Sequence, residues 1–251
     1  MDQELCTLIT GATSGIGRHI ALRLATERRL ILHGRDERKL RDLLNACARP
    51  ETHLLWTYDL ELVDGLSASL ADLLRRRETR VEALVHCAAV PHLQAFRSTS
   101  PESEWELFNV NFFSAVEMIR CLRRKEPNRA SLTNILLVSS ASSLVGERGN
   151  SLYTASKGAL DSFMKSLAIE LAPGARVNSL LPGMVATGMS VPLLDSSAYA
   201  DAVKPNYPLG IGCGDDIATA AHFLLSADAR WITGQQIIVD GGYSAHANHS
   251  I

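Results

Sequence analysis

The sequence lacks the features that mark membrane, secreted and nucleic-acid-binding proteins. No apolar run approaches the roughly 20 residues that span a bilayer, and the first residues, Met1-Asp-Gln-Glu4, do not have a signal-peptide layout. The 251 residues carry a formal charge of -2, which gives no reason to expect a nucleic-acid partner. We therefore expect a cytoplasmic protein that binds neither membranes nor nucleic acid.

Cysteine is sparse, and repeats and linkers are missing. The five cysteines, at positions 6, 47, 87, 121 and 213, form no CxxC pair and no cluster with metal-ligand spacing. Reduced thiols are the simplest interpretation, and no metal site is predicted. Without a low-complexity tract or linker, the chain reads as a single domain over residues 1–251.

Apolar segments alternate with amphipathic ones along the whole chain. An apolar fraction of 46% is ample for a core. Near-continuous apolar strands separated by helices indicate a parallel sheet covered on both faces. We predict the α/β class, as one doubly wound Rossmann domain with a parallel seven-stranded sheet. The strands are expected at Leu5–Thr10, Leu30–Leu32, His53–Tyr58, Ala83–His86, Leu132–Val138, Arg176–Leu181 and Gln236–Val239, and the main helices at Gly15–Glu27, Glu37–Ala48, Leu62–Arg77, Glu104–Lys125 and Tyr153–Leu171.

One segment, from Gly188 to Gly210, departs from this alternation. It holds three prolines, several serines and little helical periodicity. Irregular surface segments of this kind often cover binding sites. We expect a mobile substrate-binding loop at 188–210.

A glycine-rich turn follows the first predicted strand. Its sequence is Thr10-Gly11-Ala-Thr-Ser14-Gly15-Ile-Gly17, and a helix is predicted directly after it. Glycines allow a tight turn and a close ligand approach, and a helix N-terminus favours a pyrophosphate. The spacing differs from the general G-x-G-x-x-G, but the strand–turn–helix context favours a dinucleotide site over a turn without a ligand.

The tip of the second strand bears on the choice of cofactor. The sequence there is His33-Gly34-Arg35-Asp36, so the tip carries no carboxylate and an arginine follows it. Arg35 can pair with a 2′-phosphate, which favours NADP(H) over NAD(H). Asp36 leaves NAD(H) as a second candidate cofactor. The alternative to a phosphate contact is that Arg35 is only a solvated loop residue. Asp59-Leu60, after the third strand, could meet the adenine or form a simple turn.

Tyr153 and Lys157 are the clearest candidates for chemistry. Residues four apart on a helix share a face, so the phenol and the ammonium can point into one site. An unperturbed tyrosine titrates near ~10. A cation beside it favours the phenolate and moves its pKa toward the range where acid–base catalysis is effective.

Together these motifs resemble the short-chain dehydrogenase/reductase family, in its single-domain branch and with a layout closest to 3-oxoacyl-acyl-carrier-protein reductases. The resemblance covers almost the whole chain, with the motifs in the family's order and spacing. It rests on Thr10-Gly11-x-x-x-Gly15-x-Gly17, Asn111, Ser140, the Tyr153/Lys157 pair, Pro182-Gly183-Met-Val-Ala-Thr187 and Val239-Asp-Gly-Gly242.

The resemblance implies a role for each catalytic residue. Tyr153 would be the acid in carbonyl reduction and the base in alcohol oxidation, and Lys157 would lower its pKa and hold the nicotinamide ribose. Ser140 would bond the substrate oxygen, with Ser139 as its adjacent competitor. Asn111 would position a water that links Lys157 to solvent.

The resemblance also implies the cofactor contacts. Thr187 and the backbone at Val185 would anchor the nicotinamide carboxamide. The full implied set is Gly11, Thr13, Ser14, Gly15, Ile16, Gly17, Arg35, Asp59, Leu60, Cys87, Ala88, Tyr153, Lys157, Pro182, Gly183, Val185 and Thr187.

One motif departs from the family. The usual Asn-Asn-Ala-Gly after the fourth strand reads His86-Cys87-Ala88-Ala89 here. His86 could replace the strand tether that the first Asn provides, which is favoured over a catalytic His86 or a reactive Cys87. Ala89 disfavours a positive φ and would narrow the cofactor cleft.

The expected function is that of an NADP(H)-dependent oxidoreductase that interconverts a ketone and a secondary alcohol, with a 3-oxoacyl thioester as one candidate. A sugar or specialised-metabolite dehydrogenase, a nucleotide-sugar epimerase or dehydratase, and a non-catalytic dinucleotide sensor or scaffold are the alternatives. His92 and Gln94 are candidate pocket residues. The family forms dimers or tetramers, which here would involve Tyr153–Leu171, with Leu160, Phe163 and Met164, and Asp215–Ser226.

Overall fold

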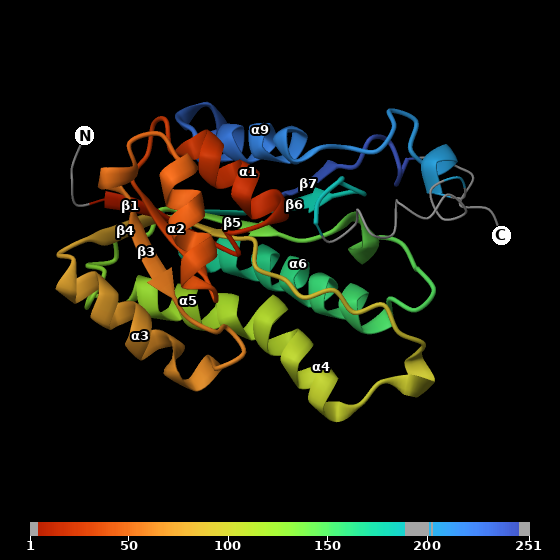
Figure 1. Ribbon diagram of the computed structural model, residues 1–251, viewed down its shortest axis with the longest axis horizontal. Helices are drawn as coiled ribbons and strands as arrows, with labels where there is room; N and C mark the ends of the chain where they lie inside the picture. The colour runs from red at the N-terminus through yellow and green to blue at the C-terminus, as the bar shows by residue number, and fades with distance from the viewer. Residues whose placement is uncertain (1–4, 189–200, 202, 246–251) are drawn as a thin grey trace.

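The computed structural model describes residues 5–188, 201 and 203–245, and a parallel sheet lies at its centre (Figure 1). The strand order β3-β2-β1-β4-β5-β6-β7 reverses direction between β1 and β4. Open α/β sheets bind ligands outside the carboxyl ends of the strands at such a point. The predicted doubly wound, seven-stranded parallel Rossmann fold is confirmed. The strands are β1 (Leu5–Thr10), β2 (Leu30–Gly34), β3 (Leu54–Thr57), β4 (Arg80–His86), β5 (Asn134–Val138), β6 (Arg176–Pro182) and β7 (Gln236–Val239).

Helices cover both faces of the sheet (Figure 1). One face carries α1 (Gly15–Leu24), α2 (Glu37–Ala46) and α9 (Gly214–Leu225), and the other carries α3 (Val63–Arg76), α5 (Ser114–Arg123) and α6 (Ser151–Leu171). Helix α4 (Pro101–Phe108) precedes α5. Short 3-10 helices occupy Pro50–Thr52, Phe96–Ser98, Ala141–Ser143, Lys204–Asn206 and Ala227–Ala229.

The single helix predicted from Glu104 to Lys125 is wrong in two respects. The helix begins earlier, at Pro101, because the Ser100 hydroxyl accepts a hydrogen bond from the Ser103 N–H at 3.4 Å and caps it. A π turn at Asn109–Phe113 then separates α4 from α5. Such turns are frequent at functional sites, and this one carries Asn111.

The predicted loop at 188–210 is described only in part. Residues 189–200 and 202 lie outside the described residues. Beyond them Lys204–Asn206 forms a 3-10 helix and Tyr207 is buried. A bridge between Val185 and Gly212 joins the two ends of the segment.

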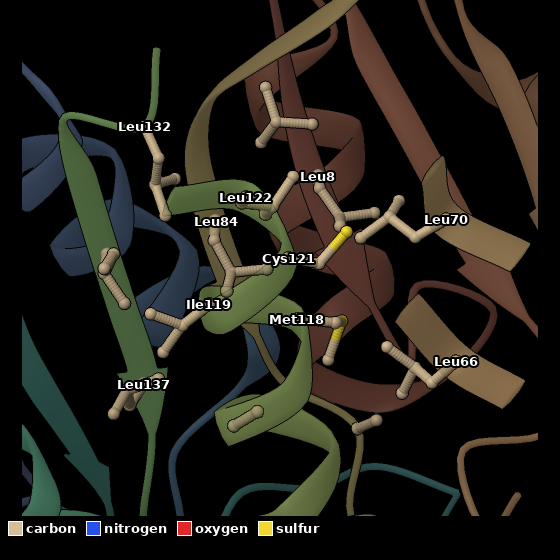
Figure 2. Close-up of a cluster of buried hydrophobic side chains, with 14 of the residues drawn as sticks. Leu8, Leu66, Leu70, Leu84, Met118, Ile119, Cys121, Leu122, Leu132 and Leu137 are labelled. Atoms are coloured by element: carbon tan, nitrogen blue, oxygen red, sulfur yellow. The ribbon is translucent and has the colours of Figure 1, made fainter. Parts of the chain in front are cut away.

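The core between the sheet and helices α3 and α5 is built from aliphatic side chains (Figure 2). Leu8 from β1 and Leu84 from β4 meet Leu70 from α3 and Met118 from α5, and all four are fully buried. Burial of one such side chain contributes about 1.5–3 kcal/mol. The same core absorbs two residues of α6 that the family resemblance had linked to subunit contacts, Leu160 and Met164.

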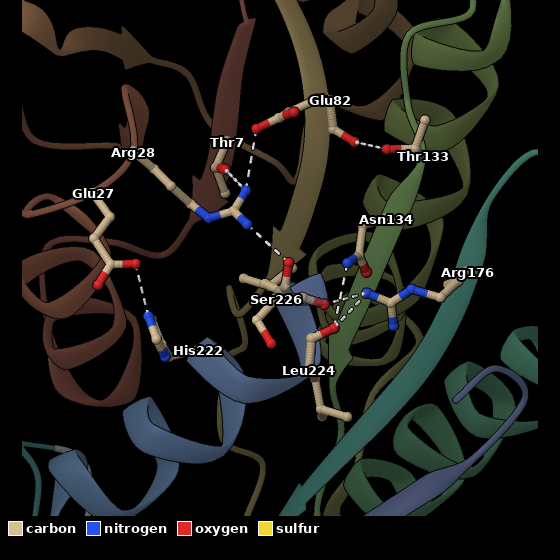
Figure 3. Close-up of polar contacts among 11 residues, drawn as sticks. Thr7, Glu27, Arg28, Glu82, Thr133, Asn134, Arg176, His222, Leu224 and Ser226 are labelled. Carbon is tan, nitrogen blue, oxygen red and sulfur yellow. Dashed lines mark hydrogen bonds and ion pairs between the residues drawn. The ribbon is translucent and has the colours of Figure 1, made fainter. Parts of the chain in front are cut away.

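Two arginines fasten α9 at the amino edge of the sheet (Figure 3). Arg28 donates to the carbonyl of Leu225 at 2.8 Å and to Glu82 at 3.1 Å. Arg176 donates to the carbonyl of Leu224 at 2.8 Å. These bonds satisfy carbonyls that the last turn of a helix leaves free. The polar contacts at the amino edge therefore hold α9 in place. The candidate site lies at the opposite, carboxyl edge of the sheet.

Thr10 joins β1 to the chain that leaves β4. Its hydroxyl oxygen accepts hydrogen bonds from the N–H groups of Cys87 and Ala88, both at 3.1 Å, and lies 3.1 Å from His86 Nδ1. Since that oxygen already accepts two bonds, its own hydrogen points to Nδ1. Burial, with the charge of Lys157, lowers the pKa of His86 to about 3, so the ring is a neutral acceptor. His86 thus supplies the tether expected of it.

Thr10→Val tests this junction, because valine keeps the shape and removes the hydroxyl. Two N–H groups and one ring nitrogen would lose their partner in a buried place, so the free energy of unfolding should fall by about 2–4 kcal/mol. Urea denaturation measures the change. Thr10→Ser, which keeps the hydroxyl, should lose less, and a Thr10→Val protein as stable as the unaltered one would contradict the assignment.

Candidate active site

A cleft of about 470 Å³ opens at the carboxyl edge of the sheet, where the chain leaves β1, β4 and β5. The glycine turn forms one wall, and the start of α6 forms another. Ten of the residues predicted to hold the cofactor line it together: Gly11, Ser14, Gly15, Ile16, Gly17, Cys87, Ala88, Tyr153, Lys157 and Thr187.

The glycine positions of the turn cannot take a side chain without strain or close contact. Gly11 and Gly15 have φ values of 63° and 50°, a region that L side chains rarely adopt. A Cβ on Gly17 would lie 2.3 Å from the Gly11 carbonyl oxygen, and one on Gly11 would lie 2.8 Å from the backbone of Ala88. Helix α1 begins at Gly15, so its free N–H groups face the cleft. This cradle fits the pyrophosphate of a dinucleotide.

A buried histidine that the sequence reading did not single out supports the turn. His33, in β2, accepts a hydrogen bond from the Gly11 N–H at its Nδ1 and donates from Nε2 to the Tyr58 carbonyl at 3.1 Å. Burial lowers its pKa to about 4, which keeps it neutral. The only sequence signal was a histidine inside an apolar strand.

The residues predicted to meet the adenosine end of the cofactor, at the tips of β2 and β3, are not part of the cleft lining. A Cβ on Gly34 would meet the Thr13 side chain at 2.7 Å, so the bare strand tip makes room for the turn. The Arg35 side chain is 61% exposed, with Nη1 3.8 Å from an Asp59 carboxylate oxygen. Leu60 is buried in the core, so only its backbone remains for a ligand.

Tyr153 and Lys157 meet in the cleft on one face of α6. The Lys157 ammonium lies 5.7 Å from the centre of the tyrosine ring and donates to the Val138 carbonyl at 2.9 Å. Burial lowers the pKa of Lys157 to about 8, against the opposing effects of Cys87 and Asp161. Burial raises the pKa of Tyr153 to about 12, although a hydrogen bond to Ser140 acts the other way. The expected lowering of the tyrosine pKa is therefore not met in this geometry, where burial dominates.

The two adjacent serines after β5 have different partners. The Ser140 hydroxyl accepts a hydrogen bond from the Ser142 N–H at 3.2 Å, and Ser140 lies close enough to Tyr153 to lower the pKa of its phenol. The Ser139 hydroxyl donates instead to Asp161 at 2.9 Å and is buried. Of the two candidates, Ser140 is the one that acts on the tyrosine.

Asp161 is a second residue that the sequence reading missed. It follows Lys157 by one turn of α6 and is 4% exposed. Its Oδ2 accepts from the hydroxyls of Ser139 at 2.9 Å and Ser143 at 2.7 Å, which flank the turn that begins with Ser140. The spacing of four from Lys157 was the available signal.

Asn111 is fully buried and ties three segments together. Its side-chain oxygen accepts from the Val90 N–H at 2.9 Å, and its amide donates to the Ser156 hydroxyl at 3.1 Å. It therefore links the π turn to the loop after β4 and to α6, between Tyr153 and Lys157. The water relay expected of Asn111 stays a prediction.

The altered motif after β4 fits without strain. Ala89 is not among the non-glycine residues with positive φ in the described ranges, which are Arg49, Glu78, Arg129 and Ala130. The backbone at position 89 therefore does not need the positive φ that alanine disfavours. The narrower cleft expected from Ala89 stays a prediction. Burial raises the pKa of Cys87 to about 12, so this residue is a neutral thiol in the cleft wall.

A second cavity, of about 250 Å³, adjoins the cleft and shares Tyr153 and Thr187 with it. Pro182, Gly183 and Val185, predicted to meet the nicotinamide end of the cofactor, line this cavity. It also contains His92, but not Gln94, the other candidate pocket residue. Glu147 and Tyr207 line it too, from 144–152 and 188–210, two segments where pocket specificity is expected from the sequence. Tyr243 is the lining residue that the sequence did not indicate.

Two further features are absent from residues 5–188, 201 and 203–245. No helix there is long and apolar enough to cross a membrane. Within the same ranges, no group of three or more His, Cys, Asp or Glu residues could hold a metal ion.

Comparisons with known proteins agree with this geometry. Residues 11–244 match the family described as enoyl-(acyl carrier protein) reductase. The chain is 36% identical over 179 residues to cyclopentanol dehydrogenase of Comamonas sp., covering 70% of each protein. It is 32% identical to L-xylulose reductase of Bos taurus, over 98% of this chain and 100% of that one.

Solved structures share the fold over nearly the whole chain. A short-chain glucose/ribitol dehydrogenase from Brucella melitensis is 27% identical, with a TM-score of 0.86 and 97% of each chain covered. A 4-hydroxyisoleucine dehydrogenase complexed with NADH is 25% identical, with a TM-score of 0.88, covering 96% of this chain and 99% of that one. The chain belongs to the short-chain dehydrogenase/reductase family and is an NAD(P)-dependent oxidoreductase that acts on a CH–OH/C=O pair.

Proposed function

We propose that this protein uses NADP(H) in preference to NAD(H) to interconvert a ketone and a secondary alcohol. The observation that carries the proposal is that Ser140, Tyr153 and Lys157 lie together where the dinucleotide cleft meets the second cavity, with Tyr153 in the wall of both. Relatives named as dehydrogenases of cyclopentanol and reductases of L-xylulose support an alcohol or ketone substrate.

The cleft residues would hold the dinucleotide along its length. The glycine turn from Gly11 to Gly17 would take the pyrophosphate, and Lys157 and Thr187 would meet the nicotinamide end. When bound, the cofactor supplies a hydride to the carbonyl carbon or accepts one from the alcohol carbon. Arg35, exposed and 3.8 Å from Asp59, is the cation available for a 2′-phosphate.

Side chains of the protein would transfer the proton and stabilise the charge that this transfer leaves behind. In reduction the Tyr153 hydroxyl gives its proton to the carbonyl oxygen, which Ser140 holds by a hydrogen bond. The Lys157 ammonium, 5.7 Å from the ring centre, stabilises the phenolate that remains. The net reaction is ketone + NADPH + H⁺ to alcohol + NADP⁺, and oxidation runs through the same groups in reverse.

The alternative functions differ in the substrate that the second cavity must bind. A 3-oxoacyl thioester remains a candidate substrate from the motif layout, and sugars are candidates from relatives named for L-xylulose, D-erythrulose and glucose. The placement of Lys157 beside the Tyr153 ring, with Ser140 in the same cavity wall, favours catalysis over a non-catalytic sensor, since a sensor has no use for an acid–base pair.

We also propose a cytoplasmic homo-oligomer, either a dimer or a tetramer. Trp231 is 93% exposed before the edge strand β7, and Ile238 on that strand and Phe223 on α9 are 44% exposed each. Large apolar side chains gathered along a sheet edge and its covering helix are suited to burial against a second copy.

Tyr153→Phe tests the acid–base role. Removal of the hydroxyl should lower kcat by roughly 10²- to 10⁴-fold, the usual range for a general acid. The dissociation constant for NADPH, measured by fluorescence titration, should change by less than about threefold because the ring still lines the cleft. A variant that keeps more than about a tenth of the turnover would refute the role.

Asp161→Asn tests the positioning of Ser140 and the support of Lys157. Loss of hydrogen bonds from Ser139 and Ser143 to a charged group should lower kcat by roughly 10- to 100-fold. Four charged or titratable groups face Lys157: His86 at the end of β4, Cys87 directly after it, and Tyr153 and Asp161 on α6.

The pH profile separates this role from a loss of structure. The pKa of Lys157 is about 8, and removal of the Asp161 anion should make the ammonium lose its proton at lower pH. The alkaline limb of kcat/KM should therefore shift toward lower pH. Asp42→Asn, an exposed acid on α2, is the matched control and should leave the profile in place. A fall in kcat in Asp161→Asn without a shift of the alkaline limb of kcat/KM would argue against an electrostatic effect of Asp161 on Lys157.

Arg35→Ala tests the cofactor preference. The variant should bind NADPH roughly 10- to 100-fold more weakly, the usual loss of a charge-assisted bond, and NADH less than about twofold more weakly. Isothermal titration with both dinucleotides gives the two constants. Arg77→Ala, exposed at the end of α3, is the control, and equal losses for both cofactors in Arg35→Ala would reject the 2′-phosphate contact.

A further inference from the structure

The second cavity carries polar groups that the proton transfer does not use. Besides Ser140 and Tyr153, its wall contains the carboxylate of Glu147, the phenol of Tyr243 and the imidazole of His92. The carboxylate is close enough to Tyr153 to raise the pKa of its phenol, after the larger effect of burial. A substrate carbonyl held at Tyr153 would therefore extend toward these groups.

The Glu147 carboxylate is held in place from two sides. Tyr243 donates its hydroxyl to Oε1 at 3.2 Å, and Asn150 donates its side-chain amide to Oε2 at 2.7 Å. Tyr243 is itself fixed by stacking on Tyr207, with ring centroids 4.8 Å apart. A carboxylate has about four acceptor positions, so two fixed donors leave Glu147 able to accept further hydrogen bonds from a ligand.

His92 lines the same cavity. Both of its ring nitrogens are buried, and neither has a hydrogen-bond partner among residues 5–188, 201 and 203–245. A neutral imidazole offers one donor and one acceptor, and buried polar groups in proteins are nearly always satisfied. The loop of His92 lies against that of Glu147, because the Gln94 N–H donates to the Gly149 carbonyl at 2.8 Å. The two walls therefore present an acceptor and an unsatisfied imidazole to one ligand.

The described lining of the cavity contains neither lysine nor arginine to pair with an anionic substrate. The nearest basic residues along the chain, Arg148 and Lys204, are exposed and do not line it. A carboxylate or phosphate beside Glu147 would meet repulsion without a partner.

We propose that Glu147, oriented by Tyr243 and Asn150, forms with His92 a hydroxyl-binding subsite that selects uncharged polyhydroxylated ketones and alcohols. This inference rests on the proposed ketone–alcohol activity and names its substrate class. A polyol supplies hydroxyl donors for Glu147 and a donor and an acceptor for His92. An apolar ketone would leave these buried groups unpaired, and a substrate with an anionic group near its carbonyl would be repelled by Glu147.

Three ketones of different chemistry test the subsite: erythrulose, which is uncharged and hydroxylated, cyclopentanone, which has no hydroxyl, and acetoacetate, which is anionic. The quantity measured is the ratio of kcat/KM values with NADPH. The unaltered enzyme should prefer erythrulose over both others by at least roughly 10-fold, and Glu147→Gln should lower the erythrulose-to-cyclopentanone ratio by roughly 10- to 100-fold.

A second variant separates charge from hydrogen bonding. Glu147→Gln should raise acetoacetate relative to cyclopentanone because the repelling charge is gone, whereas Tyr243→Phe should lower the erythrulose ratio without that rise, because the carboxylate remains. Glu51→Gln, an exposed acid before β3, is the matched control and should alter none of the ratios.

The results of these assays tell a failure of the proposed subsite apart from a failure of the proposed ketone–alcohol activity. Reduction of cyclopentanone or acetoacetate in preference to erythrulose, or unchanged ratios in Glu147→Gln, would overturn the subsite while the ketone–alcohol function stands. Failure of the unaltered enzyme to reduce any of the three ketones, or to oxidise their alcohols with NADP⁺ or NAD⁺, would overturn both.

Discussion

The buried ammonium of Lys157 is the constraint on which the site depends. It is 1% exposed, and a charge removed from water must be compensated by nearby acceptors. The carbonyl of Val138, at the end of β5, accepts its hydrogen bond at 2.9 Å, and Asp161 lies one turn away on α6. These contacts set the register of α6 against β5. Because Tyr153 precedes Lys157 by one turn, the same register brings the phenol to Ser140.

Asp161 connects this constraint to the turn that carries the serine. Its Oδ2 accepts hydrogen bonds from Ser139 and Ser143, so one buried anion both faces Lys157 and holds the backbone around Ser140. The turn that carries Ser140 is thus held by buried groups rather than by loop geometry alone. Networks of this kind are strong when fully satisfied and costly when one member is lost.

Two neutral histidines hold the other side of the cleft. His86 bonds Thr10 across β1 and β4, and His33 bonds the Gly11 N–H from β2, with burial lowering both pKa values to about 3 and about 4. A neutral imidazole can accept and donate one hydrogen bond each, much as an amide can. His86 therefore replaces the family's asparagine without a change of charge beside Lys157.

The amino-acid sequence by itself determined the parallel sheet, the glycine turn and the Tyr153/Lys157 pair, because hydrophobic period and residue spacing encode local structure directly. It did not determine the break in the helix near Asn111, the histidine tethers or the network of Asp161, since these depend on contacts between segments far apart in the chain. Only the tertiary structure decided that burial raises the pKa of Tyr153 to about 12. It alone also brought Tyr243 to Glu147, 96 residues apart, because the chain returns past β7 to the carboxyl edge of the sheet.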